Sequence, residues 1–293
     1  MDNSKLMHKN AKSGKIYKVI IYLLLTIWAL TTLYPFVWVI LNSFKPKNLI
    51  LQDTFSLPIG DKFTMQNYMD AFNRVDIPAA YRNSIVISGV VTLFVMVIAG
   101  LASYGLVRYN FKGKKFLQSA VIAAMMFPVF STIIPVFRME AGMGIANTDS
   151  LVLTWLSVIL PQTAGNLAFS MVVLMSFMKS LPLDLEEAAF IEGYNVVQIF
   201  FKIIIPLAKP SFSTVAIFTF LWSYNDLFTQ MFFLRSARYF TITRLLNEIS
   251  SQAGTNFGMM ASAVVLVVVP IMIVYVFLQK NIVKGLTAGA IKG

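Results

Sequence analysis

The chain contains no cysteine and a single histidine among its 293 residues. The lack of cysteine excludes disulfides, thiolate metal sites and cysteine nucleophiles. The histidine, His8, lies in a lysine-rich stretch near the N-terminus, where we expect it to be solvated. There is also no HExxH motif, no glycine-rich phosphate loop followed by lysine and no nucleophile elbow. These absences predict that the chain is not an enzyme, holds no metal and has no cradle for a nucleotide.

Charged residues are also scarce, at 13% of the sequence, whereas 57% of the residues are hydrophobic and 14% are aromatic. The mean hydropathy of +0.72 is typical of a protein that crosses a membrane several times. The net charge of +11 would suggest nucleic-acid binding in a soluble protein, but here the cations lie at the ends of apolar runs. The composition therefore predicts an all-α membrane protein without a nucleic-acid partner.

Six apolar runs are long enough to cross a bilayer. They cover residues 19–41, 84–107, 116–137, 150–178, 207–234 and 258–278. A polar break at residues 161–166 interrupts the fourth run, and such a break is tolerated only where it faces protein or water. We predict a tail at residues 1–18, a six-helix transmembrane domain at residues 19–280 and a second tail at residues 281–293. The first outer connection, residues 42–83, contains a predicted interfacial helix at residues 65–72.

Lysine and arginine are unevenly distributed over the connections. With six spans both termini lie on one side of the membrane, and 15 of the 24 lysines and arginines fall in segments on that side. The longer connections on the other side hold the remaining nine. Because cytoplasmic segments carry such an excess of cations, we expect both termini in the cytoplasm. The connection between the fourth and fifth spans is then cytoplasmic too.

That cytoplasmic connection holds a cluster of three glutamates in a chain with few acids. They are Glu186, Glu187 and Glu192. Asp184 and Glu187 have the spacing of a capping box, and the same spacing begins again at Asn195. Gly193 supplies a left-handed stop between the two. The pattern predicts two short helices over residues 184–205, here called the coupling segment. Spacing alone fits an ordinary amphipathic loop helix equally well.

The coupling segment resembles the EAA loop of permease subunits in bacterial ATP-binding-cassette (ABC) importers. The resemblance is carried by Glu187-Ala188-Ala189, Gly193, Phe200, Ile203, Pro206-Leu207 and Pro210. The chain departs from the family pattern at Glu192, Tyr194 and Ile205, where the family usually has Asp, Ala and Leu. The charge and the apolar character are nevertheless kept at Glu192 and Ile205.

Further matches extend the resemblance along the chain. Residues 283–293, VKGLTAGAIKG, resemble the C-terminal signature of maltose-transporter-type sugar permeases. Residues 222–228 are similar to the W-N-[DE]-F stretch of the fifth span, and residues 34–46 and 82–84 also match the pattern. The chain therefore resembles a maltose-transporter-type carbohydrate uptake permease of a bacterial type I ABC importer.

The resemblance implies one permease of a heterodimer that imports a carbohydrate, first of all an oligosaccharide, across the bacterial cytoplasmic membrane. The implied partners are a second permease subunit, a cytoplasmic ATPase dimer that holds ATP and Mg²⁺, and an extracytoplasmic solute-binding protein. The residues implied in ATPase coupling are Glu187, Ala188, Ala189, Glu192, Gly193 and Pro206. The tail residues implied to reach the ATPase are Lys284, Gly285, Thr287, Gly289 and Lys292.

Polar and aromatic residues near the breaks in the fourth and fifth spans are candidates for the substrate path, because aromatic rings suit sugar faces and amides suit hydroxyls. They are Gln162, Asn166, Trp222, Tyr224, Asn225 and Asp226. Aromatic residues near an interface also serve as lipid anchors. The partner permease could equally make most sugar contacts.

Other functions remain open from the sequence. A secondary transporter driven by an ion gradient keeps several ionisable residues in its spans, whereas this chain has one, Asp226, which suits a helix cap as well as a relay. An ABC importer for a polyol phosphate such as glycerol phosphate would have the same architecture. A membrane enzyme would need paired acids, or a serine with a base at depth, and the spans offer neither.

Overall fold

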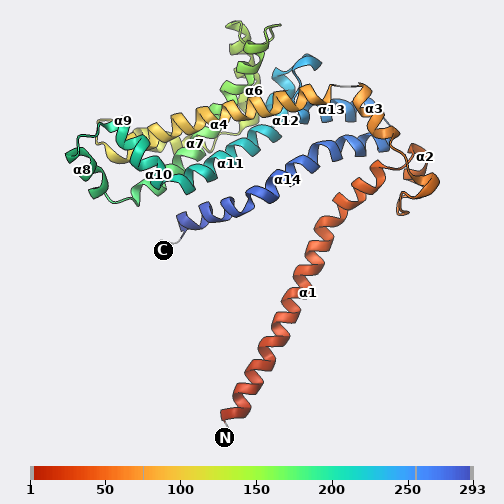
Figure 1. The fold of residues 1–293 in the computed structure, drawn as a ribbon. Helices are drawn as coiled ribbons and strands as arrows, with labels where there is room; N and C mark the ends of the chain where they lie inside the picture. The colour runs from red at the N-terminus through yellow and green to blue at the C-terminus, as the bar shows by residue number, and fades with distance from the viewer. Residues whose placement is uncertain (1–2, 75, 255, 291–293) are drawn as a thin grey trace. The chain divides into compact units, whose positions relative to one another are not determined.

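The computed structural model describes residues 3–74, 76–254 and 256–290, which form helices joined by turns and no strand (Figure 1). The all-α prediction is thus confirmed for the described part of the chain. Two compact units are present, and each is described by itself. The first contains residues 1–73 and 249–266, and the second contains residues 74–248 and 267–293.

The first unit begins with a long helix, α1 (Asn3–Ser43), whose most apolar stretch is exposed throughout. From residue 3 on, the backbone of the predicted N-terminal tail therefore continues into the first span without a break. A short helix α2 (Lys47–Gln52), a 3₁₀ turn (Gly60–Lys62) and α3 (Gln66–Arg74) follow. The helix α3 confirms that the stretch predicted at residues 65–72 is largely helical.

A buried lysine organises the turn after α1. The Lys45 ammonium donates hydrogen bonds to the carbonyl oxygens of Asp53 at 3.0 Å and Thr54 at 2.8 Å. The Asn67 amide donates to the carbonyl of Lys45 at 2.8 Å. A Cβ atom on Gly258 would lie 2.6 Å from the Asn67 side chain, so this close approach requires glycine. The stretch at residues 42–46 that matched the family pattern is therefore the anchor of the first outer connection.

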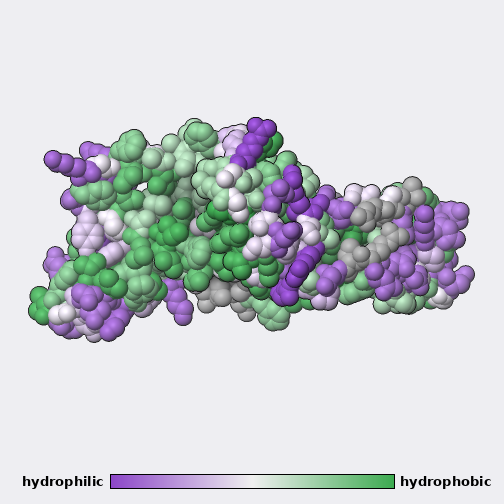
Figure 2. Space-filling view, turned by 90° about the horizontal axis from the view of Figure 1, so that it is seen from above, coloured by the Kyte–Doolittle hydropathy of each residue, from purple (hydrophilic) through white to green (hydrophobic). Residues whose placement is uncertain are grey.

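The second unit is built on three long helices, α4 (Ile77–Arg108), α7 (Leu151–Lys179) and α11 (Lys209–Asn225), and α4 packs against both others. Val91, Val95 and Ala99 of α4 are fully buried in this core. A Cβ atom on Gly100 would lie 3.0 Å from the Phe212 ring, so the missing side chain lets α4 and α11 approach closely. Apolar side chains dominate the left-hand half of the view in Figure 2, and polar ones lie at its left-hand end, where Figure 1 shows α8.

Shorter elements complete the structure. They are α5 (Lys114–Ala124), α6 (Val129–Gly142), α8 (Asp184–Ile191), α9 (Val196–Ile199), a π-helical turn (Phe200–Ile204), α10 (Ile205–Leu207), α12 (Leu227–Phe233), a 3₁₀ turn (Ala237–Tyr239), α13 (Ile242–Ala253) and α14 (Phe257–Ala290). The last two helices contribute residues to both units.

Four described helices are long and apolar enough to cross a membrane. They are Ile16–Ser43, Ile77–Arg108, Leu151–Met178 and Phe257–Phe277. A fifth would be the pair Val196–Leu207 and Lys209–Asn225, which is bent by 82°. These helices correspond to the first, second, fourth, sixth and fifth predicted spans.

The predicted third span is not a single helix. The helices α5 and α6 contain 11 and 14 residues and are separated by the turn that ends at Pro128. Each is shorter than the roughly 20 residues that a bilayer requires. The fifth predicted span also ends early, because α11 stops at Asn225 and α12 begins at Leu227.

The polar break in the fourth span does not interrupt the helix, since α7 runs continuously through Pro161, and Gln162 and Thr163 within the break are buried and face protein, as predicted. Proline removes one backbone N–H from the helix ladder. In an apolar setting the rest of the ladder has no competing water, so the helix persists on both sides of the ring. Gln162 and Asn166 consequently lie one turn apart on one helix, where the Asn166 amide donates to the Gln162 carbonyl at 2.7 Å.

Candidate functional site

The coupling segment lies at one end of the layer formed by α4, α7 and α11, and α12 lies at the other end (Figure 1). The predicted capping box at Asp184 is wrong. Leu183 is already close to helical geometry, with φ −68° and ψ −31°, so Asp184 is the first residue of α8 and no side chain caps the helix. Its carboxylate still lies in the first turn, where the helix dipole favours an anion.

The second predicted capping box is confirmed. The Asn195 side chain accepts a hydrogen bond from the backbone N–H of Gln198, and the Gln198 side chain accepts one from the backbone N–H of Asn195, both at 2.9 Å. Together these bonds satisfy donors that the first turn of α9 would otherwise leave unpaired.

Between the two helices, Gly193 is left-handed, with φ 86°, as predicted. The Gly193 N–H donates to the Phe190 carbonyl, and the Tyr194 N–H donates to the Ala189 carbonyl, both at 3.0 Å. This pair of bonds is a Schellman motif, which ends a helix and sets the direction of the chain that follows. The joint between α8 and α9 therefore has a defined geometry.

Most residues predicted to couple to an ATPase lie on the surface of the second unit. Glu187, Ala188, Glu192, Gly193 and Pro206 are exposed. Ala189 alone is buried, with 4% of its surface exposed. The exposed residues are free to meet another protein, and Ala189 faces the unit itself.

The adjacent glutamate, Glu186, was not among the predicted site residues, and it is buried. Its Oε1 atom lies 2.5 Å from Nε of Arg108, and the Tyr104 hydroxyl donates to its Oε2 atom at 2.8 Å. A guanidinium nitrogen of Arg108 also donates to the Leu181 carbonyl at 3.2 Å. We call Tyr104, Arg108 and Glu186 the Glu186 cluster. A usable signal was the helical spacing of Glu186 and Ala189, which places both on one face.

A π-helical turn follows α9. The N–H of Ile205 bonds to the carbonyl of Phe200, and Pro206 then offers no N–H to continue the ladder. The Phe200 ring is buried, with its centroid 5.4 Å from that of Tyr104. Both halves of the coupling segment thus contact the end of α4. π-Helical turns occur frequently at functional sites.

The predicted tail site falls largely outside the described part of the chain. The backbone of Lys284, Gly285, Thr287 and Gly289 belongs to α14, but their surroundings are not described. Lys292 lies outside the described residues altogether.

A cavity of about 270 Å³ lies among α6, α7, α11 and α12 of the second unit. Its lining combines amides, aromatic rings, a hydroxyl-bearing pair and one carboxylate: Phe130, Pro161, Gln162, Gly165, Asn166, Trp222, Ser223, Asp226, Phe228 and Thr229. Four of the six predicted path residues, Gln162, Asn166, Trp222 and Asp226, are therefore brought together. The volume is just below the lower end, about 300 Å³, of ordinary small-molecule sites.

Hydrogen bonds hold one wall of this cavity. The Gln162 amide donates to Oδ2 of Asp226 at 3.0 Å, and the Ser223 hydroxyl donates to the Gln162 oxygen at 2.5 Å. The other Asp226 oxygen accepts from the backbone N–H of Thr229 at 3.1 Å, which caps α12. We call Gln162, Ser223 and Asp226 the Gln162 cluster. The interpretation of Asp226 as a helix cap is confirmed, and both of its oxygens have partners.

Aromatic residues complete the wall. The Trp222 side chain is 46% exposed, and its ring packs against that of Phe169 at 4.8 Å between centroids. Phe130 and Phe228 meet edge to face at 4.7 Å. These two phenylalanines were not predicted from the sequence. Pro128, two residues before Phe130, marks the turn before α6 and was a usable signal.

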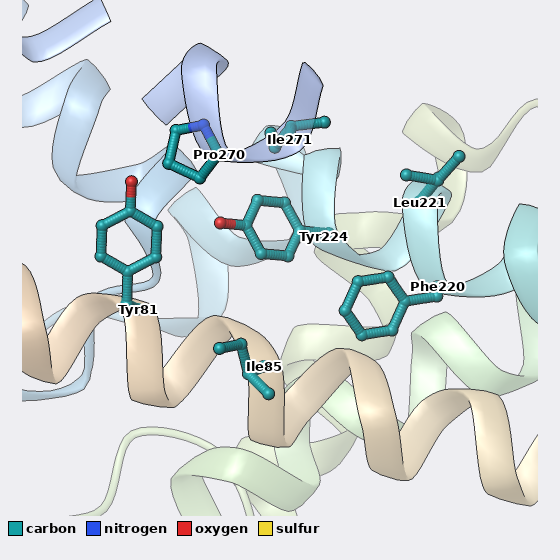
Figure 3. Close-up of a pocket in the computed structure, with 7 residues that line it drawn as sticks. All are labelled: Tyr81, Ile85, Phe220, Leu221, Tyr224, Pro270 and Ile271. Atoms are coloured by element: carbon teal, nitrogen blue, oxygen red, sulfur yellow. The ribbon is translucent and has the colours of Figure 1, made fainter. Parts of the chain in front are cut away.

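Two predicted path residues lie elsewhere. Tyr224 lines a separate, smaller cavity of about 130 Å³ with Tyr81, Phe220 and Pro270. Figure 3 shows its hydroxyl directed toward Tyr81. Positions two apart on a helix point in nearly opposite directions, so Tyr224 cannot share the face of Trp222 and Asp226. Asn225 is exposed, and its amide donates back to the Leu221 carbonyl at 2.8 Å.

Residues 95–288, more than half of the chain, match the family described as "Binding-protein-dependent transport system inner membrane component". The chain is 31% identical over 291 residues to the diacetylchitobiose uptake system permease protein NgcG of Streptomyces coelicolor, with 98% of this chain and 93% of that protein covered. It is 31% identical over 263 residues to the trehalose transport system permease protein SugB of Mycobacterium tuberculosis, with 89% and 93% covered. It is 29% identical over 289 residues to the arabinooligosaccharides transport system permease protein AraQ of Bacillus subtilis, with 98% and 100% covered.

Among solved structures, the chain resembles a bacterial ABC transporter involved in the import of the acidic polysaccharide alginate. The TM-score is 0.77 at 22% identity, and 92% of this chain and 97% of that chain are covered. A second structure, of an alginate ABC transporter in complex with an alginate pentasaccharide-bound periplasmic protein, gives a TM-score of 0.62 at 17% identity, with 94% and 93% covered. The likeness confirms the predicted permease fold.

Proposed function

The chain belongs to the family of binding-protein-dependent transport system inner membrane components, and we propose on that premise that it is one of two permease subunits of an ATP-driven carbohydrate importer. As a member of this family it is an inner-membrane permease component and not the subunit that hydrolyses ATP. The relatives named for diacetylchitobiose, trehalose and arabinooligosaccharides support a carbohydrate as its cargo, first of all an oligosaccharide.

The proposal includes six spans with both termini in the cytoplasm. In this topology α5 and α6 together cross the membrane as a broken third span, and the bent pair before Asn225 provides the fifth. The excess of lysine and arginine in the segments assigned to the cytoplasm supports this orientation. The coupling segment, residues 184–205, then faces the cytoplasm, as do the tails at residues 1–18 and 281–293.

The proposed partners are a second permease subunit, a cytoplasmic ATPase dimer that carries ATP and Mg²⁺, and an extracytoplasmic binding protein. The solved relative in complex with a periplasmic binding protein supports the last of these. The exposed row of Glu187, Ala188, Glu192 and Gly193 supports docking of the ATPase at α8, with Glu187 as the polar anchor. The C-terminal tail is proposed to reach the same ATPase. The stretch at residues 239–257 is proposed to lie on the outer side and to contact the binding protein.

The proposed substrate class rests on the cavity at the Gln162 cluster. Amide groups at Gln162 and Asn166 offer donors and acceptors to hydroxyls, and the half-exposed Trp222 ring offers an apolar face. None of the described residues that line the cavity is a lysine or arginine, and Asp226 brings a carboxylate. A phosphate ester would need a cationic or backbone N–H cradle, so the lining favours a neutral carbohydrate over a polyol phosphate.

Two measurements test the proposal. The binding protein is co-purified with the complex, and its bound ligand is identified by mass spectrometry; a neutral saccharide is expected, whereas a polyol phosphate would contradict the proposed substrate class. Uptake in cells is then measured with vanadate or with an ionophore that collapses ion gradients. Uptake that stops with vanadate and continues with the ionophore is expected, and the reverse result would identify a secondary transporter.

A further inference from the structure

The Glu186 cluster is the most completely buried charged group at the end of the second unit that carries α8. The side chains of Arg108 and Glu186 are 8% and 7% exposed. Their neighbours Asp184, Leu185 and Glu187 are all exposed, so burial is confined to the face of α8 that carries Glu186 and Ala189. A buried ion pair is weak as a source of stability, because taking two charges out of water costs about as much as their attraction returns. Its contribution here is a defined geometry.

That geometry fastens α8 to α4 at more than one point. Tyr104 and Arg108 are four residues apart on α4 and therefore lie on the same face, one turn from each other. Between them they contact both oxygens of Glu186, and Arg108 also binds the Leu181 carbonyl just before α8 begins. A helix held by one contact can pivot, whereas a helix held at its first turn and at Leu181 in the preceding turn cannot rotate freely.

The covalent route from α8 into the membrane is longer and bent. It passes the left-handed Gly193, the helix α9 and the π-helical turn, and then turns by 82° between Leu207 and Lys209. The route through the Glu186 cluster reaches α4 directly.

The same end of α4 is tied to the other long helices. Gly100 allows the Phe212 ring of α11 and the Phe200 ring of the π-helical turn to approach to 3.0 Å and 3.3 Å of where a Cβ atom would be. The Ser103 hydroxyl donates to the Met171 carbonyl of α7 at 3.3 Å. A displacement of this part of α4 would therefore be shared with α7 and α11.

We propose that Tyr104 and Arg108 are positioning residues that lock Glu186 of α8 to α4, so that movement of α8 enters the membrane through the second span. On this view the two adjacent glutamates have separate roles: Glu187 faces the ATPase and Glu186 fastens the helix to its own subunit. The inference rests on the proposed function, because it concerns how ATPase motion reaches the spans.

The test uses the assembled complex in lipid nanodiscs and measures the stimulation of ATPase activity by the loaded binding protein. In Glu186→Gln and Arg108→Gln complexes the ATPase still co-purifies, and stimulation falls about tenfold, within the usual range of coupling between sites. Tyr104→Phe keeps the ring and loses one hydrogen bond, so stimulation falls about threefold. The control is Asp53→Asn, which removes a half-exposed ion pair with Lys62 in the first outer connection and leaves stimulation unchanged.

A second variant separates positioning from general structural damage. Because this chain has no cysteine, the double substitution Arg108→Cys with Glu186→Cys introduces the only two thiols in it. Stimulation is expected to be low while both thiols are reduced and to recover when a short bifunctional thiol reagent joins them. A purely structural role for the cluster predicts no recovery.

The outcomes distinguish this inference from the proposed function. If the wild-type complex shows no stimulation by any loaded binding protein, the proposed function fails, whatever the variants do. If the wild type is stimulated and the Glu186→Gln complex is stimulated equally, α8 does not act through α4 and the inference fails alone. Loss of stimulation in the cysteine pair that bridging does not reverse would also overturn it.

Discussion

The second unit contains two buried polar clusters that differ in charge and in what they border. The Glu186 cluster joins α8 to α4 through a full ion pair at the end of the unit. The Gln162 cluster joins α7 to the junction of α11 and α12 through a neutral amide and opens onto a cavity of about 270 Å³. Both join segments that lie far apart in the sequence.

The two kinds of group are useful for different tasks. An ion pair with a guanidinium has a planar, directional geometry, so it keeps one helix in register with another when a partner pushes on it. An amide has both donors and an acceptor and can exchange a protein partner for a ligand hydroxyl. The first cluster therefore suits transmission of movement, and the second suits passage of a polar solute.

The largest effect is expected at the solvent-exposed face of the coupling segment. Glu187→Lys reverses the charge of an exposed residue next to the Glu186 cluster and leaves that cluster intact. A charge reversed against a matched partner surface costs several kcal/mol, so ATPase binding should weaken by about 100-fold or more. Co-purification of the ATPase and uptake in cells measure this. Retention of both at wild-type levels would rule out Glu187 as the anchor.

The helix α4, which carries Tyr104 and Arg108 of the Glu186 cluster, can be tested through its packing. Gly100→Val places methyl groups against the Phe212 and Phe200 rings, where even a Cβ atom lies at 3.0 Å and 3.3 Å. Overpacking of this kind destabilises a core by about 1–3 kcal/mol. The thermal unfolding temperature of the purified complex should fall.

The matched control lies on the same helix. A Cβ atom on Gly105 would meet nothing within 4 Å, so Gly105→Ala should leave the unfolding temperature unchanged or raise it slightly. An equal drop for both variants would show that α4 does not pack as described.

The Gln162 cluster predicts a change in substrate handling. Gln162→Ala removes the amide that faces Asp226 and Ser223, and the KM for uptake should rise by about three- to tenfold, the value of one or two hydrogen bonds. Asn225→Ala is the control, because Asn225 is exposed outside the cavity. A KM that changes for Asn225→Ala and not for Gln162→Ala would assign the path to another face of α11.

The smallest effect is expected at the helix caps. Asn195→Ala removes the side chain that caps α9 and should destabilise its first turn by about 1 kcal/mol. Asp184→Ala should cost only about 0.3 kcal/mol, since Asp184 interacts with the helix dipole and caps nothing. Hydrogen exchange of the backbone amides in α8 and α9 measures the stability of both first turns in one experiment. Faster exchange in α8 than in α9 after these substitutions would contradict the observed caps.

Local features of the coupling segment could be predicted from the sequence. The left-handed Gly193 and the Asn195 capping box depend on residues within one turn of each other, and both are as predicted. The box at Asp184 failed because the helix begins one residue earlier, which the spacing of side chains does not reveal. Helix ends are set by backbone angles, and several nearby polar residues can satisfy the same pattern.

The burial of Glu186 could not be predicted in this way. Glu186 and Glu187 are chemically identical neighbours, and which one is buried depends on how α8 is rotated against α4. The partner residue Tyr104 lies 82 positions earlier in the chain. In the same way, Tyr224 and Trp222 belong to one motif but to opposite sides of α11.

An all-α membrane protein of the permease family could be predicted from the sequence, because hydrophobic run length, charge at the span ends and the EAA-type motif are all local properties of the chain. The burial of Arg108 against Glu186 and the shared cavity wall of Gln162 and Asp226 are visible only in the tertiary structure. The continuity of α7 through Pro161 is also visible only there. Those outcomes depend on contacts between helices distant in the sequence, and such contacts are selected by the packing of the whole unit.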